Sequence, residues 1–120
     1  MTQDEEKYAT AGRELLEKAR EELAQGDLRQ ASEKGWGAAA QIVKAVATRR
    51  GWQHGSHADL FTVVRRLRLE TRDRRLQENF HAANSLHYNF YEDRMESEDI
   101  EVGLDQVSEF VQRMERFLTD

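Results

Sequence analysis

Cysteine and proline are both absent from this sequence of 120 residues. Without cysteine, the chain has no disulfide bridge, no cysteine-ligated zinc and no thiol nucleophile. Without proline, and with many alanine, leucine, glutamate, arginine and glutamine residues, the composition predicts an all-α protein. The length suits one hydrophobic core, so we expect residues 1–120 to form a single domain.

Long apolar runs are also absent from the sequence. No stretch approaches the roughly 20 apolar residues that a helix needs to cross a bilayer. The acidic first residues do not resemble a secretory signal. We therefore expect a soluble cytoplasmic protein with no membrane partner.

Charge is distributed unevenly along the chain, although the formal net charge is only −5. Residues 49–75 contain eight arginines and three acids, whereas residues 76–120 contain three arginines and eleven acids. A basic segment of this kind favours an anionic partner such as a nucleic acid. Alternatively, the basic and acidic segments complement each other within the monomer or across a dimer.

Apolar residues recur at three- and four-residue steps in five segments, which predicts five helices. Short connections between long helices make neighbours antiparallel, so we expect an up-and-down bundle of four long helices and one shorter helix. The second helix has two adjacent apolar stripes rich in small residues, and we expect it to be the central helix, packed on two sides. The first, second and fourth expected helices span about residues 3–25, 28–50 and 72–93. The third begins at Ser56 and His57 and ends at a break near residues 71–73, and the fifth follows its cap at Ser97 and carries its apolar stripe to Leu118.

The fifth helix has the most regular apolar stripe. Ser97 is expected to cap it, with acidic residues following in the first turn, where the helix dipole favours anions. The stripe either serves the core alone or also meets a second copy, and we expect a homodimer. Its residues are Ile100, Leu104, Val107, Val111, Met114 and Leu118.

Polar residues are dense on the fourth helix. Asn84, His87 and Tyr91 follow each other at steps of three and four, so they project from one side. His87 is either a core histidine bonded to a neighbouring helix, or a general base or phosphate contact at the mouth of a groove. The expected inward face of this helix comprises Leu76, Phe80, Ala83, His87 and Phe90.

Other basic residues offer contacts for phosphate. Arg74 and His81 lie two turns apart, about 10 Å along the helix axis, and either reach one phosphate together or are simply solvated. Arg65, Arg68 and Arg72 form a row on the third helix. This row either follows a nucleic-acid backbone or remains a solvated face.

Metal and cofactor sites are not expected. His54 and His57 flank a Gly-Ser pair, but two histidines without a third ligand do not complete a metal site. We expect Ser56 and His57 simply to begin the third helix. The sequence has no glycine-rich phosphate loop, no Gly-x-Ser-x-Gly motif and no internal repeat, so no cofactor is predicted.

Three stretches carry a resemblance to a known family. They are the alanine-rich residues 31–40 with Lys44-Ala45, the sequence Ser-His-Ala-Asp-Leu at 56–60, and Ala-Ala-Asn-Ser-Leu-His-Tyr-Asn-Phe-Tyr-Glu at 82–92. In their order and spacing they resemble the archaeal PaREP-type family, a branch of the HEPN superfamily (higher eukaryotes and prokaryotes nucleotide-binding). The likeness extends over about residues 5–118.

The resemblance implies an antiparallel HEPN-like bundle of four or five helices that is often dimeric. Many HEPN members are metal-independent ribonucleases, frequently toxins or defence proteins. In these, an arginine and a histidine, separated by four to six residues on the equivalent of the fourth helix, stabilise the phosphate and activate the ribose 2′-OH. Other members lack the pair and act as binding or partner modules, some beside nucleotidyltransferases.

The ribonuclease pair is not intact at His87. The positions where its arginine partner would lie hold Phe80, His81 and Ala82. Arg74 or Arg75 has the required spacing only to His81, which lies outside the distinctive stretch at 86–92. We therefore expect a binding module rather than an enzyme.

The predicted function is the binding of a nucleotide, a nucleic acid or a protein partner through a polar groove on the fourth helix. One alternative is a metal-independent endoribonuclease that uses His87 or His81 with a nearby arginine such as Arg74. Another is a structural dimer without a ligand. A nucleotidyltransferase or an antitoxin is a further candidate partner. The expected groove residues are Asn84, His87, Tyr88, Tyr91, Lys44 and Trp36, with Arg65, Arg68 and Arg72 at the rim.

Overall fold

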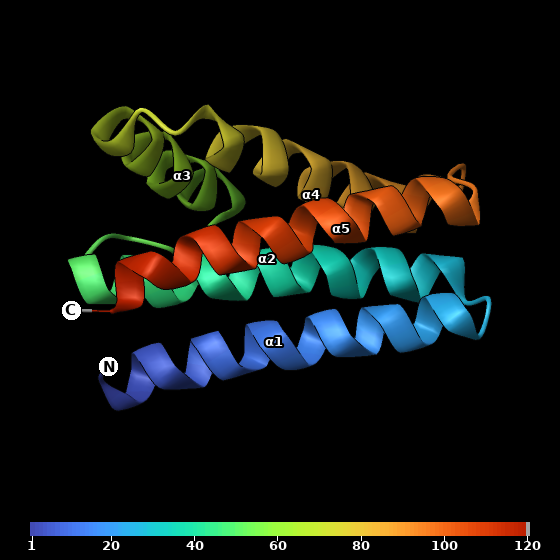
Figure 1. Cartoon of the computed structure of the whole chain (residues 1–120), viewed down its shortest axis with the longest axis horizontal. Helices are drawn as coiled ribbons and strands as arrows, with labels where there is room; N and C mark the ends of the chain where they lie inside the picture. The colour runs from blue at the N-terminus through green and yellow to red at the C-terminus, as the bar shows by residue number, and fades with distance from the viewer. Residues whose placement is uncertain (120) are drawn as a thin grey trace.

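The computed structural model describes residues 1–119 and contains five α-helices and a terminal 3₁₀ turn, with no strand in that range (Figure 1). The predicted all-α fold is confirmed. The first two helices begin where the periodicity predicts, whereas the fourth begins at Arg74 rather than at residue 72. The elements are α1 Gln3–Ala24, α2 Leu28–Arg50, α3 His57–Thr71, α4 Arg74–Glu92, α5 Ser97–Glu115 and η1 Arg116–Leu118.

The central helix is α2, as predicted. It packs against α1, α4 and α5, and Figure 1 shows α1 and α5 running alongside it. Small residues permit this close approach. A Cβ atom at Gly35 would lie 2.6 Å from Leu104 Cδ2 and 2.9 Å from Leu86 Cδ1, so α4 and α5 both reach the α2 backbone there.

The apolar stripe of α5 is fully used by the core of this one chain. All six of its predicted residues are buried, from Ile100 to Leu118. The stripe therefore gives no support to the expected homodimer, which stays a prediction. Within residues 1–119 no helix is both long and apolar enough to span a membrane.

The helix ends explain the boundaries. Ser56 and Asp59 form the predicted capping box at the start of α3. The prediction that Ser97 caps α5 was wrong: Ser97 is the first helical residue, and the preceding Glu96 is the cap, its N–H donating to Asp99 Oδ2 at 3.0 Å. Arg72 ends α3 in the left-handed region with φ 60°, which turns the chain sharply into α4.

This turn separates Arg75 from the arginine row of α3. Arg75 instead forms ion pairs with Glu78 and Glu109 on the opposite side of α4. Hydrogen bonds from Arg75, Asn79 and Arg113 lower the pKa of Glu109 to about 2. Glu109 thus stays ionised near neutral pH and holds two arginines, Arg75 and Arg113, at the α4–α5 interface.

A buried asparagine closes the end of the bundle where α4 meets α5. Asn89 Nδ2 donates to Ser32 Oγ at 2.8 Å, which ties α4 to α2. Asn89 Oδ1 accepts from the backbone N–H groups of Arg94 and Met95, both at 2.8 Å. One side chain therefore satisfies the turn after α4 and a hydroxyl of the central helix.

Asn89→Ala is expected to destabilise the protein by about 2–4 kcal/mol, because it leaves two backbone donors and the Ser32 hydroxyl without their buried acceptor or donor. Urea unfolding followed by circular dichroism measures this change. Ser85→Ala is the matched control on the same helix, since the Ser85 hydroxyl is exposed and bonds only to the His81 carbonyl. An Asn89→Ala protein as stable as Ser85→Ala would contradict the role assigned to this side chain.

Candidate functional site

Three helices bring aromatic and imidazole rings together around Trp36. The indole of Trp36, on α2, is 8% exposed and packs against His57 of α3, with ring centroids 4.9 Å apart. It also packs against His87 of α4 at 5.1 Å. The two imidazoles lie 5.6 Å from each other. We call these three rings, with the hydrogen-bonding partners Glu33 and Asn84, the imidazole cluster.

Each imidazole is held through one nitrogen by an oxygen on another helix. His87 Nδ1 lies 3.0 Å from Glu33 Oε1, and His57 Nε2 lies 3.1 Å from Asn84 Oδ1. Because both oxygens accept, the bonded nitrogens carry the protons in the neutral rings. His87 Nε2 and His57 Nδ1 are then unprotonated, and neither has a hydrogen-bond partner within residues 1–119.

The position of His87 differs from that predicted for the α4 inward face. Leu76, Phe80 and Ala83 are buried, but the His87 side chain is 25% exposed and Phe90 is half-buried. His87 bonds to the neighbouring α2, as the core interpretation predicts, yet it also reaches solvent. The reason is its place at the edge of the α2–α4 contact, beside the exposed His57.

Exposed tyrosines extend the cluster along α4. Tyr91 meets His87 edge-on at 5.6 Å, and Tyr88 lies 6.3 Å from the same imidazole. Their exposed fractions, 69% and 57%, are high for such large rings. On the other side, Phe61 of α3 contacts His57 at 5.3 Å and His81 at 5.8 Å. The rings thus form a continuous surface along the α3–α4 boundary.

The arginine row of α3 continues this surface. Residues 57, 61, 65 and 68 follow at steps of four, four and three, so Arg65 and Arg68 share the flank of α3 that carries the rings, and Arg72 follows as the C-cap of the helix. These three and Arg74 have no carboxylate partner within residues 1–119, and Arg68 Nε is buried without a hydrogen bond. We call these four arginines and the neighbouring rings the α3–α4 strip. Its rings are those of Trp36, His57, Phe61, His81, His87, Tyr88 and Tyr91.

The other predicted residues fall into two groups. Trp36, Tyr88 and Tyr91 contribute rings to the strip, and Asn84 bonds to His57 beside them. Lys44, two turns beyond Trp36 on α2, makes none of the ring contacts or hydrogen bonds of the cluster in the part of the chain that the structure describes. Arg74 and His81 lie on the α4 side of the strip, but no contact joins them.

His54 and His57, which flank the Gly-Ser pair, lie in different surroundings. His54 contacts Tyr8 of α1 and the Trp52 carbonyl, whereas His57 joins the cluster. Among residues 1–119 there is no group of three or more potential metal ligands.

Sequence reasoning missed Glu33, Phe61 and the role of His57. Glu33 is an ordinary charged residue of a helix until α4 brings His87 to it, 54 positions later in the chain. The resemblance held the only signal, since its three stretches supply all five members of the cluster. Residues 31–40 provide Glu33 and Trp36, residues 56–60 provide His57, and residues 82–92 provide the remaining two.

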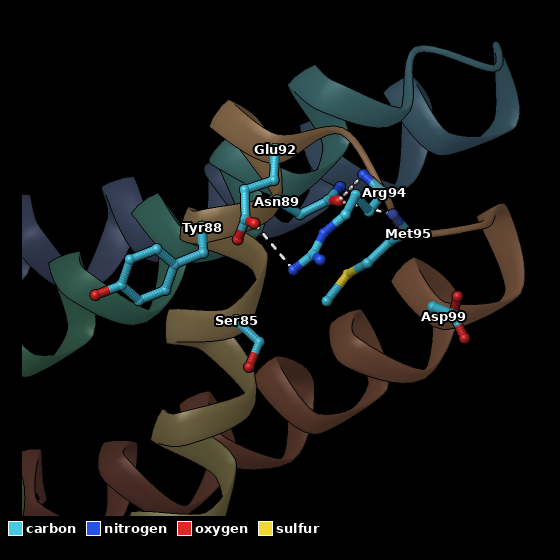
Figure 2. A pocket seen from close by; sticks show the side chains of 7 residues that line it. All are labelled: Ser85, Tyr88, Asn89, Glu92, Arg94, Met95 and Asp99. Carbon is cyan, nitrogen blue, oxygen red and sulfur yellow. Dashed lines mark hydrogen bonds and ion pairs between the residues drawn. The ribbon is translucent and has the colours of Figure 1, made fainter.

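A cavity of about 410 Å³ lies next to the strip, between the end of α4 and the start of α5 (Figure 2). Figure 2 shows the Tyr88 ring turned away from the guanidinium of Arg94 and from Met95. Arg94 is paired with Glu92 at 2.9 Å, and Asn89 uses its Oδ1 for two backbone N–H groups and its Nδ2 for Ser32 Oγ. The cavity therefore presents carboxylates and satisfied polar groups. Its lining residues are Ser85, Tyr88, Asn89, Glu92, Arg94, Met95 and Asp99.

The fold and site define a small all-α antiparallel bundle that carries an imidazole cluster on one face. The chain belongs to the archaeal PaREP1/PaREP8 family, whose model matches residues 7–111. A crystal structure of a Sulfolobus solfataricus protein matches with a TM-score of 0.77 and 22% identity, covering 99% of each chain, which shows a shared fold. No curated protein matches the chain.

The Glu33 carboxylate is expected to fix the tautomer of His87. Nitrogen-15 NMR near neutral pH should show His87 protonated at Nδ1, and Glu33→Ala should remove this preference because the acceptor is lost. Glu14→Ala, which removes an exposed carboxylate from α1, is the control and should leave the His87 signals in place. An unchanged His87 tautomer in Glu33→Ala would show that the hydrogen bond does not orient the ring.

Proposed function

We propose that this protein binds a nucleotide-containing ligand at the α3–α4 strip. The observation that carries the proposal is the continuity of two kinds of surface. At one end lie exposed tyrosine rings and two imidazoles that each have one ring nitrogen without a hydrogen-bond partner in residues 1–119. At the other end lie arginines without carboxylate partners in that range. Stacking surfaces beside unneutralised cations are the combination that proteins use for single-stranded nucleic acids and nucleotides.

The chemistry of each part supports this assignment. The faces of Tyr88 and Tyr91 offer stacking surfaces for bases, and every base has a π-face to place there. His87 Nε2 and His57 Nδ1 accept hydrogen bonds from exocyclic amines or hydroxyls when the rings are neutral. The arginines bind phosphate oxygens through paired N–H donors.

The resemblance to the HEPN superfamily agrees with a nucleotide ligand, and we propose that the PaREP1/PaREP8 bundle belongs to that superfamily. The antiparallel order of the five helices supports this placement. A homodimer in the cytoplasm, and a protein partner such as a nucleotidyltransferase or an antitoxin, are further proposals that no contact within residues 1–119 addresses.

The wild-type protein is expected to bind labelled single-stranded RNA of mixed sequence at low salt, as measured by fluorescence anisotropy. Tyr91→Ser should weaken binding by about 1–3 kcal/mol, at least fivefold in Kd, because a stacked base loses its partner. Tyr91→Phe keeps the ring and should bind like the wild type. The proposal fails if the wild-type protein binds neither RNA nor free nucleotides at low salt.

A second candidate function is metal-independent cleavage of RNA, and the spacing of the two imidazoles favours it. One neutral imidazole takes the proton from a ribose 2′-OH as its oxygen attacks phosphorus, and the other, protonated, gives a proton to the departing 5′-oxygen. The attack forms a 2′,3′-cyclic phosphate and breaks the P–O5′ bond. This pair, His57 and His87, differs from the arginine–histidine pair that the resemblance implies.

RNA cleavage in EDTA tests this second function. If it is correct, the wild-type protein leaves 2′,3′-cyclic phosphate ends, and His57→Gln and His87→Gln each lower the rate at least a hundredfold, the usual size of a lost acid or base. His54→Gln is the control, because His54 lies outside the cluster. RNA binding without any cleavage would exclude the nuclease and leave the binding function intact.

A further inference from the structure

The arginines at the turn between α3 and α4 are distinguished by their lack of a carboxylate partner. Within residues 1–119, ion pairs are formed by Arg13, Arg20, Arg49, Arg50, Arg75, Arg94 and Arg113. Arg29 and Arg66 instead lie over aromatic rings, and Arg116 lies at the C-terminal end of the bundle. The strip arginines Arg65, Arg68, Arg72 and Arg74 have neither a carboxylate nor a ring partner there, and they gather near the turn that joins the two helices. The charge there is left uncompensated by the protein itself.

Arg68 has a guanidinium N–H group that lacks an acceptor within residues 1–119. Its side chain is half-buried, and its Nε is shielded from solvent without an acceptor. A buried donor without a partner is unfavourable, and an anion seated beside the guanidinium would relieve it. Arg65 lies one turn before Arg68 on the same side of α3, and Arg72 follows as the C-cap of that helix, so three guanidinium groups offer successive positions for anions.

The end of the strip beyond Tyr91 is acidic rather than basic. Beyond Tyr91 the chain carries Glu92, Asp93 and Glu96, and Arg94 there is paired with Glu92. Arg29 of α2 is also nearby, but its guanidinium lies over the Phe90 ring and its Nε donates to the Phe90 carbonyl. Because the acids repel phosphate, we expect a polyanion that follows the strip to end near the tyrosines. From Arg74 to Tyr91 the strip is about 26 Å long, at 1.5 Å per helical residue.

We propose that the ligand of the strip is an oligonucleotide single strand rather than a mononucleotide or a duplex, an inference that rests on the proposed function. Its phosphates bind the four arginines at the α3–α4 turn, and its bases reach the imidazole cluster, Tyr88 and Tyr91. At about 3.4 Å per stacked nucleotide, 26 Å accommodates up to about eight nucleotides, and fewer when the strand is extended. A duplex buries its base faces and leaves these rings without a stacking partner.

Binding of labelled RNA strands of one, two, four, eight and twelve nucleotides tests this proposal. Affinity should rise with length and stop rising between about four and eight nucleotides. A duplex of twelve base pairs should bind at least tenfold more weakly than the single strand. Arg65→Gln should reduce the slope of log K against log salt by about 0.7, the value for one phosphate contact on a single strand.

Arg20→Gln is the matched control, because it removes one arginine charge from the α1–α5 side and should leave the salt slope unchanged. A mononucleotide that binds as tightly as the twelve-nucleotide strand would overturn the oligonucleotide inference while the proposed function stands. Duplex binding as tight as the single strand, sensitive to Arg65→Gln but not to Tyr91→Ser, would also overturn it. Absence of binding to every probe would instead refute the proposed function itself.

Discussion

The close packing of three helices against α2 is the constraint on which the rest of the structure depends. Because α2 presents mostly alanine, glycine and small β-branched residues to its neighbours, α1, α4 and α5 approach its backbone closely. Trp36 is the only aromatic residue of that helix. The large Trp36 ring extends beyond its small neighbours to the edge of the α2–α4 contact. There it packs against the imidazoles of His57 and His87.

Local patterns explain what could be predicted from the sequence. The apolar rhythm and the caps depend on residues three or four positions apart, so the ranges of α1 and α2 and the stripe of α5 follow from the sequence directly. The same periodicity places Asn84, His87 and Tyr91 on one side of α4. The capping error at Ser97 has the same origin, because Glu96 and Ser97 are neighbouring residues and both precede the apolar rhythm.

The cluster itself could not be predicted in this way. Glu33 and His87, and likewise His57 and Trp36, are distant in sequence and meet only through the order in which the helices pack. A histidine at the start of a helix looks like an ordinary first residue until the neighbouring helix supplies Asn84. The charge pattern has the same limit: counting arginines in residues 49–75 cannot show that Arg75 is neutralised across α4 and α5 while Arg65 is not.

The position of α3 gives the strip a further property. This helix packs mainly against α4 and α2 and lies away from α1 (Figure 1). The other four helices form most of the core, so α3 is the element whose detachment disturbs the fewest contacts, and its amides should exchange with solvent before those of α2. Because α3 carries His57 and two of the strip's arginines, and Arg72 follows at its C-cap, detachment of α3 would disrupt the proposed binding surface while the other four helices stayed packed. A ligand that contacts both α3 and α4 would then bind only when α3 is docked. Its binding free energy would be reduced by the free energy needed to keep α3 docked.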